Sequence, residues 1–375
     1  MTITFIDLKT QQERIRAKIE NGIQTVLDHG AYIMGPEIDL LENRLAEWTG
    51  VKHNISCSSG TDALILALMG LEIKAGQGII VPSFTFAASA EVIPLMGAIP
   101  VFAEVDGKSF NLDPEKMTDA LAAGKAAGID VVGIIGVGLF GQPANYPAIK
   151  DFARKNRLWL IDDAAQSFGA QFNGQPVGQL ADVTCTSFFP AKPLGAYGDG
   201  GAVFTNDCDI AEIIRSCRIH GMGHNKYENV RIGITGRLDS IQAVVLDAKL
   251  DIFSEELLLR QQVANRYENM LKGVVGTPIL IKGTTSSWAQ YVIKLPKGAD
   301  RKKIIKALDA ADVPTAIYYP VPVHQQPIYS PFPTSACNLP VTLDLCSRVL
   351  ALPMHPYLEV EHQRYIATSL KAALD

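Results

Sequence analysis

The chain has 375 residues, of which 47% are hydrophobic and 19% are charged, and its formal net charge is −5 at pH 7. This length allows a large core divided over about two domains, and the weakly acidic balance argues against a general nucleic-acid binder or a membrane-surface protein. No apolar run is long enough to span a bilayer, and the first residues lack the basic-then-apolar pattern of a secretory signal. We therefore expect a cytoplasmic protein.

The cysteines and histidines suggest neither a disulfide framework nor a metal centre. The six cysteines form no CxxC motif, and several of them lie inside apolar runs. The seven histidines do not pair at the spacing of metal ligands. We expect reduced thiols and no metal.

The first 50 residues predict two helices. Ile15, Ile19 and Ile23 recur at helical spacing before Gly30, and Pro36 begins a second amphipathic run.

From about residue 51 to residue 206, short apolar strands alternate with helices. This order predicts an α/β fold with a mostly parallel, seven-stranded sheet that helices cover on both faces. Ligands of such sheets bind at the carboxyl ends of the strands. The expected strands are Asn54–Cys57, Gly78–Pro82, Pro100–Val105, Val131–Phe140, Leu158–Ile161, Val183–Phe188 and Gly201–Thr205.

The first strand is followed by hydroxyl and glycine residues that open a helix. Ser58, Ser59, Gly60 and Thr61 directly precede an apolar helical run. Free N–H groups and hydroxyls at a helix start can hold a phosphate, although the same residues also serve as an ordinary N-cap.

The second strand leads into an aromatic segment. Phe84 and Phe86 follow Pro82, and either ring could lie flat against a planar ligand or simply fill the core.

The fifth strand ends near two carboxylates, Asp162 and Asp163, followed by small residues. One carboxylate here could face a buried cation, such as a protonated pyridine nitrogen. The alternative is a helix N-cap.

After the sixth strand comes Lys192, between Pro190 and Pro193, in a glycine-rich segment. A lysine without a full water shell loses basicity and can attack a carbonyl, whereas the alternative is a surface lysine in a glycine loop. Together, the four strand ends offer a phosphate cradle, a ring stacker, an anion and an amine. This set fits pyridoxal phosphate (PLP) better than a dinucleotide, because the chain has no GxGxxG or GxxxxGK[ST] motif.

The remainder predicts a connector helix and a smaller α/β domain. The connector runs from Ile241 to about Leu271, and the smaller domain contains strand Ala289–Leu295 and helix Ile304–Ala311. We expect a large domain over residues 1–250 and a small domain over residues 251–375.

The chain resembles the DegT/DnrJ/EryC1/StrS sugar aminotransferases over almost its full length. The resemblance implies a type I PLP-dependent aminotransferase fold and a homodimer with active sites at the subunit interface. The segments that carry it are FIDLKTQQ, YIMGPE, SSGTDAL, PSFTFAASA, LFGQPAN, IDDAAQSFGA, SFFPAKPLGAYGDGGAVFTND, GRLDSIQA and LPMHPYL.

The resemblance also implies roles for individual residues. Lys192 is the lysine that forms an imine with the PLP aldehyde, Asp163 pairs with the pyridine nitrogen, and Gln166 lies near the 3′-hydroxyl. Phe86 stacks on the ring. Three further residues hold the phosphate, namely Gly60, Thr61 and Ser187.

Two departures from the family pattern concern Thr235 and Tyr318. The family usually carries Asn in place of Thr235, where it reaches across the dimer to the phosphate, and relatives tend to carry His in place of Tyr318, near the sugar. Candidate contacts to the substrate are Arg218, His220, Arg237, Tyr318, Tyr319 and His324. Arg237 is favoured among them because it lies beside the cross-dimer motif. Each charged candidate also has a structural interpretation.

The resemblance favours transfer of an amino group from L-glutamate to the 3-keto group of UDP-2-acetamido-2-deoxy-glucuronate, a reaction of O-antigen and lipopolysaccharide biosynthesis. Alternatives are amination at C4 of a 4-keto-6-deoxy nucleotide sugar, a PLP-dependent 3-dehydratase, and a non-catalytic PLP-binding regulator. The 3-dehydratases carry His in place of the lysine, so Lys192 argues against that alternative.

Overall fold

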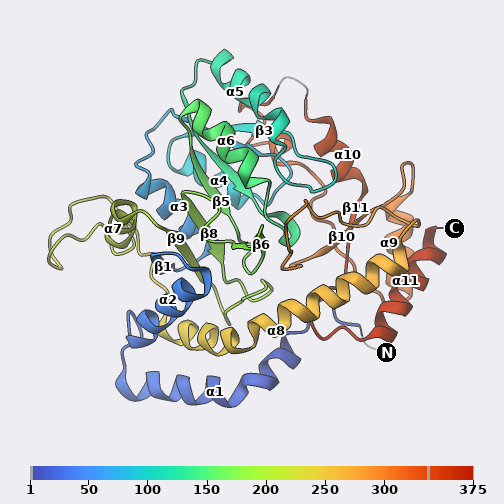
Figure 1. Ribbon diagram of the computed structural model, residues 1–375, viewed down its shortest axis with the longest axis horizontal. Coiled ribbons are helices and arrows are strands. Elements are labelled where there is room, and N and C mark those ends of the chain that lie inside the picture. Colours follow the sequence, from blue (N-terminus) through green and yellow to red (C-terminus); the bar gives the residue numbers. More distant parts are fainter. Residues whose placement is uncertain (1–2, 336–337, 375) are drawn as a thin grey trace.

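The computed structural model describes residues 3–335 and 338–374. Two N-terminal helices, α1 (Leu8–His29) and α2 (Pro36–Thr49), pack against the long helix α8 (Ser240–Leu271) (Figure 1). Asp7 caps α1 by accepting a hydrogen bond from the Thr10 amide, and Gly30 ends it in the left-handed conformation. Helix α1 therefore ends at the predicted Gly30, and α2 begins at the predicted Pro36.

The centre of the molecule is a seven-stranded sheet in the order β1-β9-β8-β5-β4-β2-β3. All neighbouring strands are parallel except β9, which runs antiparallel to both β1 and β8. The strands are β1 (His53–Cys57), β2 (Gly78–Pro82), β3 (Ile99–Ala103), β4 (Val131–Val137), β5 (Trp159–Asp163), β8 (Val183–Ser187) and β9 (Gly201–Thr205). The predicted fold class is confirmed.

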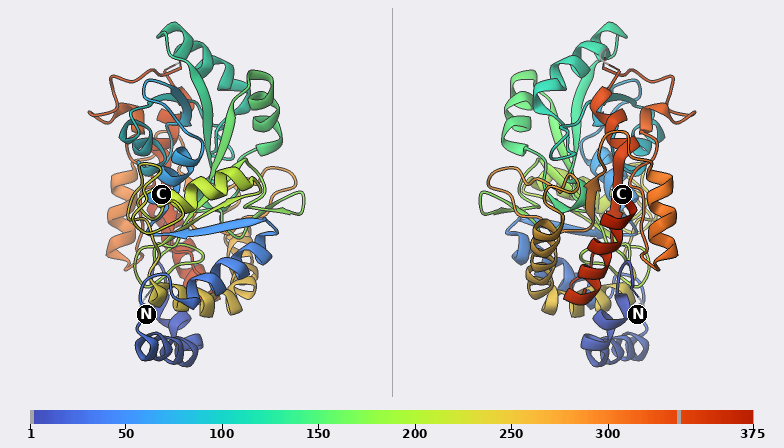
Figure 2. Two further views of the ribbon diagram at one scale, coloured as in Figure 1. Left: turned by 90° about the vertical axis from the view of Figure 1, so that its left-hand side faces the viewer. Right: turned by 90° about the vertical axis from the view of Figure 1, so that its right-hand side faces the viewer.

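Helices cover both faces of this sheet. One face packs against α3 (Gly60–Gly70), α4 (Ala88–Leu95) and α7 (Cys208–Cys217), and the other packs against α5 (Met117–Ala126) and α6 (Tyr146–Asn156). Figure 2 shows α5 and α1 at opposite ends of the molecule. Two layers of buried aliphatic side chains result, as expected for strands that are apolar on both faces.

The small C-terminal unit pairs two antiparallel strands, β10 (Tyr291–Lys294) and β11 (Val349–Leu352). Around them lie α9 (Arg301–Ala310), α10 (Pro340–Arg348) and α11 (Val360–Leu374), and α11 packs on both α9 and α8. Because α8 continues without a break through residue 250, the predicted domain boundary falls inside a helix and stays a prediction.

Several predicted element ends differ from the structure. The strand expected over Val131–Phe140 ends at Val137, because Leu139–Gly141 form a 3₁₀ turn with Phe140 at φ 61°. Strand β5 extends two residues further than expected, to Asp163. The remaining short elements are the hairpin β6 (Gln171–Phe172) with β7 (Gln175–Pro176) and two 3₁₀ turns, Pro114–Lys116 and Val323–Gln325.

The described residues contain neither a disulfide nor a membrane-spanning helix. Five cysteines in residues 3–335 and 338–374 are unpaired, and Cys337 lies outside the described part. Within the same ranges, no helix has the length and apolar character needed to cross a bilayer.

Candidate active site

Asp163 is the last residue of β5, at the carboxyl edge of the sheet, and its side chain is buried. The Ser89 hydroxyl donates to Asp163 Oδ2 at 2.6 Å, and the Ala165 amide donates to Oδ1 at 3.2 Å. Burial raises the pKa of Asp163, whereas these two donors and the charge of Lys192 oppose that rise. The site therefore holds a carboxylate with little water around it, which favours a cationic partner.

Lys192 lies in the turn that follows β8, and its amide donates to the Phe189 carbonyl at 2.8 Å. The side chain is only partly exposed. Burial lowers the pKa of Lys192, and the charge of Asp163 acts in the opposite direction. A larger fraction of this amine is thus neutral than for a surface lysine, as a nucleophilic amine requires.

The start of α3 lies directly against the end of β8. Ser59 caps α3 by accepting from the Asp62 amide at 3.0 Å. A Cβ at Gly60 would come within 2.6 Å of Ser187 Cβ, so only glycine allows this approach. Thr61 follows in the first turn of α3 and is half-buried. Free amides and hydroxyls converge here, as anion sites at helix starts require.

Two aromatic rings, Phe86 and Tyr319, and the amide of Gln166 form one side of the site near Asp163. Phe86 is 56% exposed despite being apolar, and its ring centroid lies 6.1 Å from that of Tyr319. Gln166 donates through Nε2 to the Tyr319 hydroxyl at 3.2 Å and accepts from the Phe140 amide at 2.8 Å. The exposed face of Phe86 is available to cover a planar ligand.

This donor set fits PLP, which has a phosphate, an aromatic ring, a ring nitrogen and an aldehyde. Asp163 suits the ring nitrogen and Lys192 suits the aldehyde. Phe86 suits the ring face, and the junction of Gly60 with Ser187 suits the phosphate. Residues from four separate segments of the sequence therefore supply complementary groups at one edge of the sheet.

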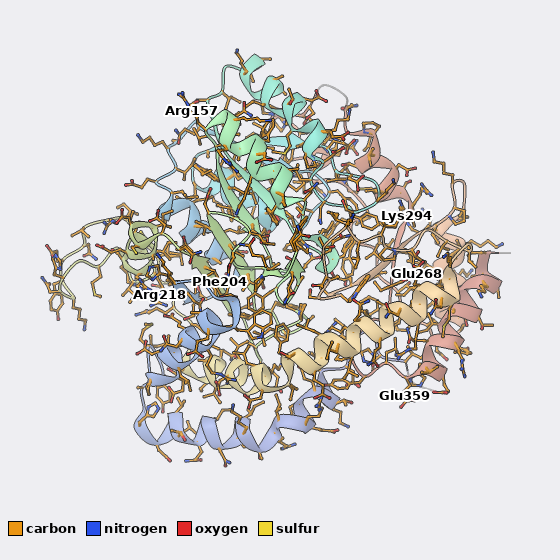
Figure 3. The ribbon with its side chains drawn as sticks, viewed as in Figure 1. Arg157, Phe204, Arg218, Glu268, Lys294 and Glu359 are labelled. Carbon is orange, nitrogen blue, oxygen red and sulfur yellow. The ribbon has the colours of Figure 1, made fainter. Side chains whose placement is uncertain are left out.

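The guanidinium of Arg218 is mostly engaged inside the fold, although its Nε has no hydrogen-bond partner among the described residues. It is buried at the end of α7 and donates to Glu42 of α2 at 2.5 Å and to the Ser56 carbonyl at 2.8 Å (Figure 3). This ion pair joins α7, α2 and β1 inside the fold and favours the structural interpretation of Arg218, whose role as a substrate contact stays a prediction.

His220 and Thr235 face each other on the loop that follows α7. Thr235 Oγ1 lies 2.8 Å from His220 Nε2, and both residues are exposed. The neighbouring Arg237 is half-buried, and its Nε has no hydrogen-bond partner among the described residues. The contact of Thr235 with a second subunit and the role of Arg237 stay predictions.

Tyr318 and His324, the candidate substrate contacts at the two ends of the proline-rich segment, differ in burial. Tyr318 is half-buried, with its ring 5.8 Å from that of Tyr319 beside the site. His324 is buried, and its Nδ1 lies 2.6 Å from the Ser83 hydroxyl. Because burial lowers the pKa of His324, its imidazole is neutral and enclosed. Its Nε2 has no hydrogen-bond partner among the described residues, and its role as a substrate contact stays a prediction.

Three residues near the site were not assigned from the sequence. Ser89 binds Asp163, while Arg260 and His355 line a cavity that also reaches Lys192. Residues of the segments FIDLKTQQ and LPMHPYL line this cavity. Because both segments resemble the family, they could have indicated from sequence that this region lies near the site.

Comparison with known proteins gives the family. Residues 13–371 match the DegT/DnrJ/EryC1/StrS aminotransferase family. The chain is 45% identical to the UDP-2-acetamido-2-deoxy-3-oxo-D-glucuronate aminotransferase of Pseudomonas aeruginosa, over 98% of this chain and 99% of that one. The chain belongs to this family and is an aminotransferase.

Solved structures agree with this assignment. The DegT DnrJ EryC1 StrS aminotransferase from Brucella abortus matches with a TM-score of 0.96 at 44% identity, covering 99% of both chains. NtdA from Bacillus subtilis, solved with the cofactor PMP bound, matches with a TM-score of 0.89 at 26% identity, covering 100% of this chain and 85% of that one.

Proposed function

We propose that this aminotransferase uses PLP to move an amino group from L-glutamate to the 3-keto group of UDP-2-acetamido-2-deoxy-glucuronate. The observation that carries the proposal is the buried Asp163 carboxylate facing Lys192, in a chain 45% identical to an aminotransferase named for this sugar. The product would serve O-antigen or lipopolysaccharide synthesis in the cytoplasm.

The cofactor, when bound, supplies an electron sink for the carbon that loses a proton. Asp163 holds a proton on the ring nitrogen through a charge-assisted contact, and Ser89 fixes the carboxylate at 2.6 Å. Phe86 covers the ring, and the α3 start with Ser187 binds the phosphate.

Lys192 has two roles in this proposal. Its amine would hold the coenzyme aldehyde, and when free it would act as the base that takes a proton from the Cα of the amino-acid donor. Burial lowers the pKa of Lys192, which places the free amine closer to the pH range in which a general base is effective. Hydrogen bonds with the Phe140 amide and the Tyr319 hydroxyl hold the Gln166 side chain in place, so it would restrict movement of the coenzyme ring.

The substrate carries a diphosphate and a carboxylate, so the site must offer cations or donors. Arg237 is our first candidate, because its Nε lacks a partner among the described residues. His220, Thr235, Tyr318 and Tyr319 are further candidates for contacts to the sugar or its phosphates.

We also propose a homodimer with the active sites at its interface. Exposed apolar side chains are concentrated near the first turn of α8, where Ser240 binds the Tyr32 carbonyl and Gln242 binds the Tyr197 amide. Such a concentration is typical of surfaces covered by another subunit. Its members are Tyr32, Ile33, Met34, Phe189 and Tyr197, each 37–52% exposed.

The test is a product analysis with a panel of nucleotide ketosugars. The purified protein with PLP and L-glutamate is incubated with the UDP-3-keto-glucuronate sugar or with 4-keto-6-deoxy sugars on UDP, dTDP and GDP. Mass spectrometry and NMR should identify a 3-amino uronate and stoichiometric 2-oxoglutarate. A 4-amino product would favour C4 amination, and no amination of any sugar would favour a non-catalytic protein.

A further inference from the structure

A narrow cavity lies beside Lys192, where the N-terminal segment meets α8 and the residues that follow β11. Its lining combines apolar rim residues with several groups that can ionise or hydrogen-bond. Its polar members are Asp7, Gln11, Lys192, Arg260, His355 and Tyr357. Ile6 and the 37%-exposed Leu8 lie on its rim.

Arg260 brings an incompletely satisfied cation to this cavity. It is 4% exposed, and one terminal nitrogen donates to the Trp288 carbonyl at 3.0 Å. Its Nε has no hydrogen-bond partner among the described residues. The nearest acidic side chain, Glu256, instead accepts from Gln11 at 2.7 Å and from Tyr357. A buried guanidinium donor without an acceptor costs free energy unless a ligand supplies one.

His355 brings a second unpartnered nitrogen to the same cavity. It is 3% exposed, and its Nε2 lies 3.4 Å from Thr4 Oγ1, whereas Nδ1 has no partner within the described ranges. Burial lowers the pKa of His355 to about 4, so the ring is neutral near pH 7. If the Thr4 hydroxyl donates to Nε2, Nδ1 carries a hydrogen and becomes a donor.

The other charged groups around the cavity are already engaged. Asp7 accepts from the amide and the hydroxyl of Thr10, and Tyr357 donates to Glu256. Besides the amine of Lys192, the free hydrogen-bonding capacity therefore lies on Arg260 Nε and His355 Nδ1, and both would act as donors.

We infer that Arg260 and His355 form a carboxylate subsite next to Lys192. This inference rests on the proposed function. An ionised carboxylate has two acceptor oxygens, which match one N–H from each residue. The cavity is narrow, with room for about one water molecule, so its lining side chains must shift before a carboxylate can enter. Both the amino-acid donor and a uronate sugar carry this group.

The test compares ligands with and without a carboxylate on the purified holoenzyme. The variants are Arg260→Met, His355→Gln and the charge-retaining Arg260→Lys. Arg16→Gln is the control, because Arg16 pairs with Glu20 on α1 and does not line the cavity. The readouts are the Kd of glutarate by calorimetry, the KM of glutamate, and the KM of the uronate sugar against the same sugar without its carboxylate.

Loss of one charge-assisted hydrogen bond should weaken a carboxylate ligand about ten- to hundredfold in Arg260→Met. We expect a smaller loss in His355→Gln, partial rescue in Arg260→Lys, and wild-type values in Arg16→Gln. Weaker glutarate and glutamate binding would assign the subsite to the donor, and weaker binding of the uronate alone would assign it to the sugar.

Equal weakening of the sugar without a carboxylate, or no weakening of any carboxylate ligand, would overturn the inference. If Arg260→Met does not fold, His355→Gln decides, and an unchanged Kd for glutarate together with an unchanged KM for the uronate overturns the subsite. Glutarate binding is measured without turnover. A failed amination assay with intact, Arg260-dependent glutarate binding would therefore reject the proposed function and retain the subsite.

Discussion

Asp163 is the residue whose charge matters most to the coenzyme. We predict that Asp163→Asn lowers turnover by about 100-fold or more, because removing one partner of a buried ion pair typically costs about 3–5 kcal/mol. The affinity for PLP, measured by absorbance titration of the apoenzyme, should also fall. Ser89→Ala, which leaves the carboxylate but removes its 2.6 Å donor, should lower turnover only about fivefold. Equal effects of the two substitutions would contradict the assigned role.

The neighbouring Asp162 contributes a pH dependence to the stability. It is fully buried, the Tyr146 hydroxyl donates to it at 2.5 Å, and burial raises its pKa to about 7. Because the unfolded pKa is near 4, the unfolded chain releases this proton first as the pH rises, and the folded state loses stability between about pH 4 and pH 7.

Asp162→Asn removes this titration. Relative to the wild type, we predict that the variant gains stability with rising pH, by up to about 4 kcal/mol over this interval. Urea unfolding at several pH values measures the difference. A stability difference that stays constant with pH would show that the carboxyl group titrates alike in both states.

The side chains of the site differ in how well their positions follow from sequence. Lys192 and Asp163 were predictable because Asp163 ends one buried strand and Lys192 follows another, and such strand ends share one edge of a parallel sheet. Arg218 and His324 were not, since only the packed structure gives them Glu42 and Ser83 as partners. The sequence alone does not show whether a charged residue in a loop faces solvent or a buried partner.

At the scale of elements, the approach of α3 to β8 forms the predicted phosphate site. Gly60→Ala would place a Cβ within 2.6 Å of Ser187 Cβ, and we predict about a tenfold loss of PLP affinity as α3 moves away. Absorbance titration with PLP measures this loss.

Gly70→Ala is the matched control at the other end of α3, where a Cβ would meet Ile214 Cγ1 at 2.8 Å. It should lower the thermal unfolding temperature without changing PLP affinity. If both variants bind PLP like the wild type, the start of α3 is not the phosphate site.

Element positions followed from apolar runs, and their ends did not. All seven strands of the main sheet were found where continuous apolar segments predicted them. The apolar run that starts at Val131 continues past the strand end, because Leu139 and Phe140 are buried in a 3₁₀ turn rather than in the sheet. The apolar character of Leu139 and Phe140 predicts that they are buried, but it does not predict their backbone conformation, which depends on the neighbouring Gly138 and Gly141.

At the scale of the whole molecule, the proposed homodimer predicts complementation. If each site uses Lys192 of one chain and Arg237 of its partner, co-expressed Lys192→Ala and Arg237→Ala chains should form heterodimers with one intact site. Random assembly then gives about a quarter of the wild-type activity, although each variant alone is nearly inactive. Activity no higher than that of the separate variants would place both residues in the same chain's site.

The most direct test of the account is the location of the covalent bond to the coenzyme. Borohydride reduction of the PLP-loaded protein, followed by peptide mass spectrometry, fixes the coenzyme on the nitrogen that holds it. We predict a single pyridoxyl label on the peptide that contains Lys192. A label on Lys249, a buried lysine whose pKa is lowered by burial to about 8, would contradict the account, and so would the absence of any label.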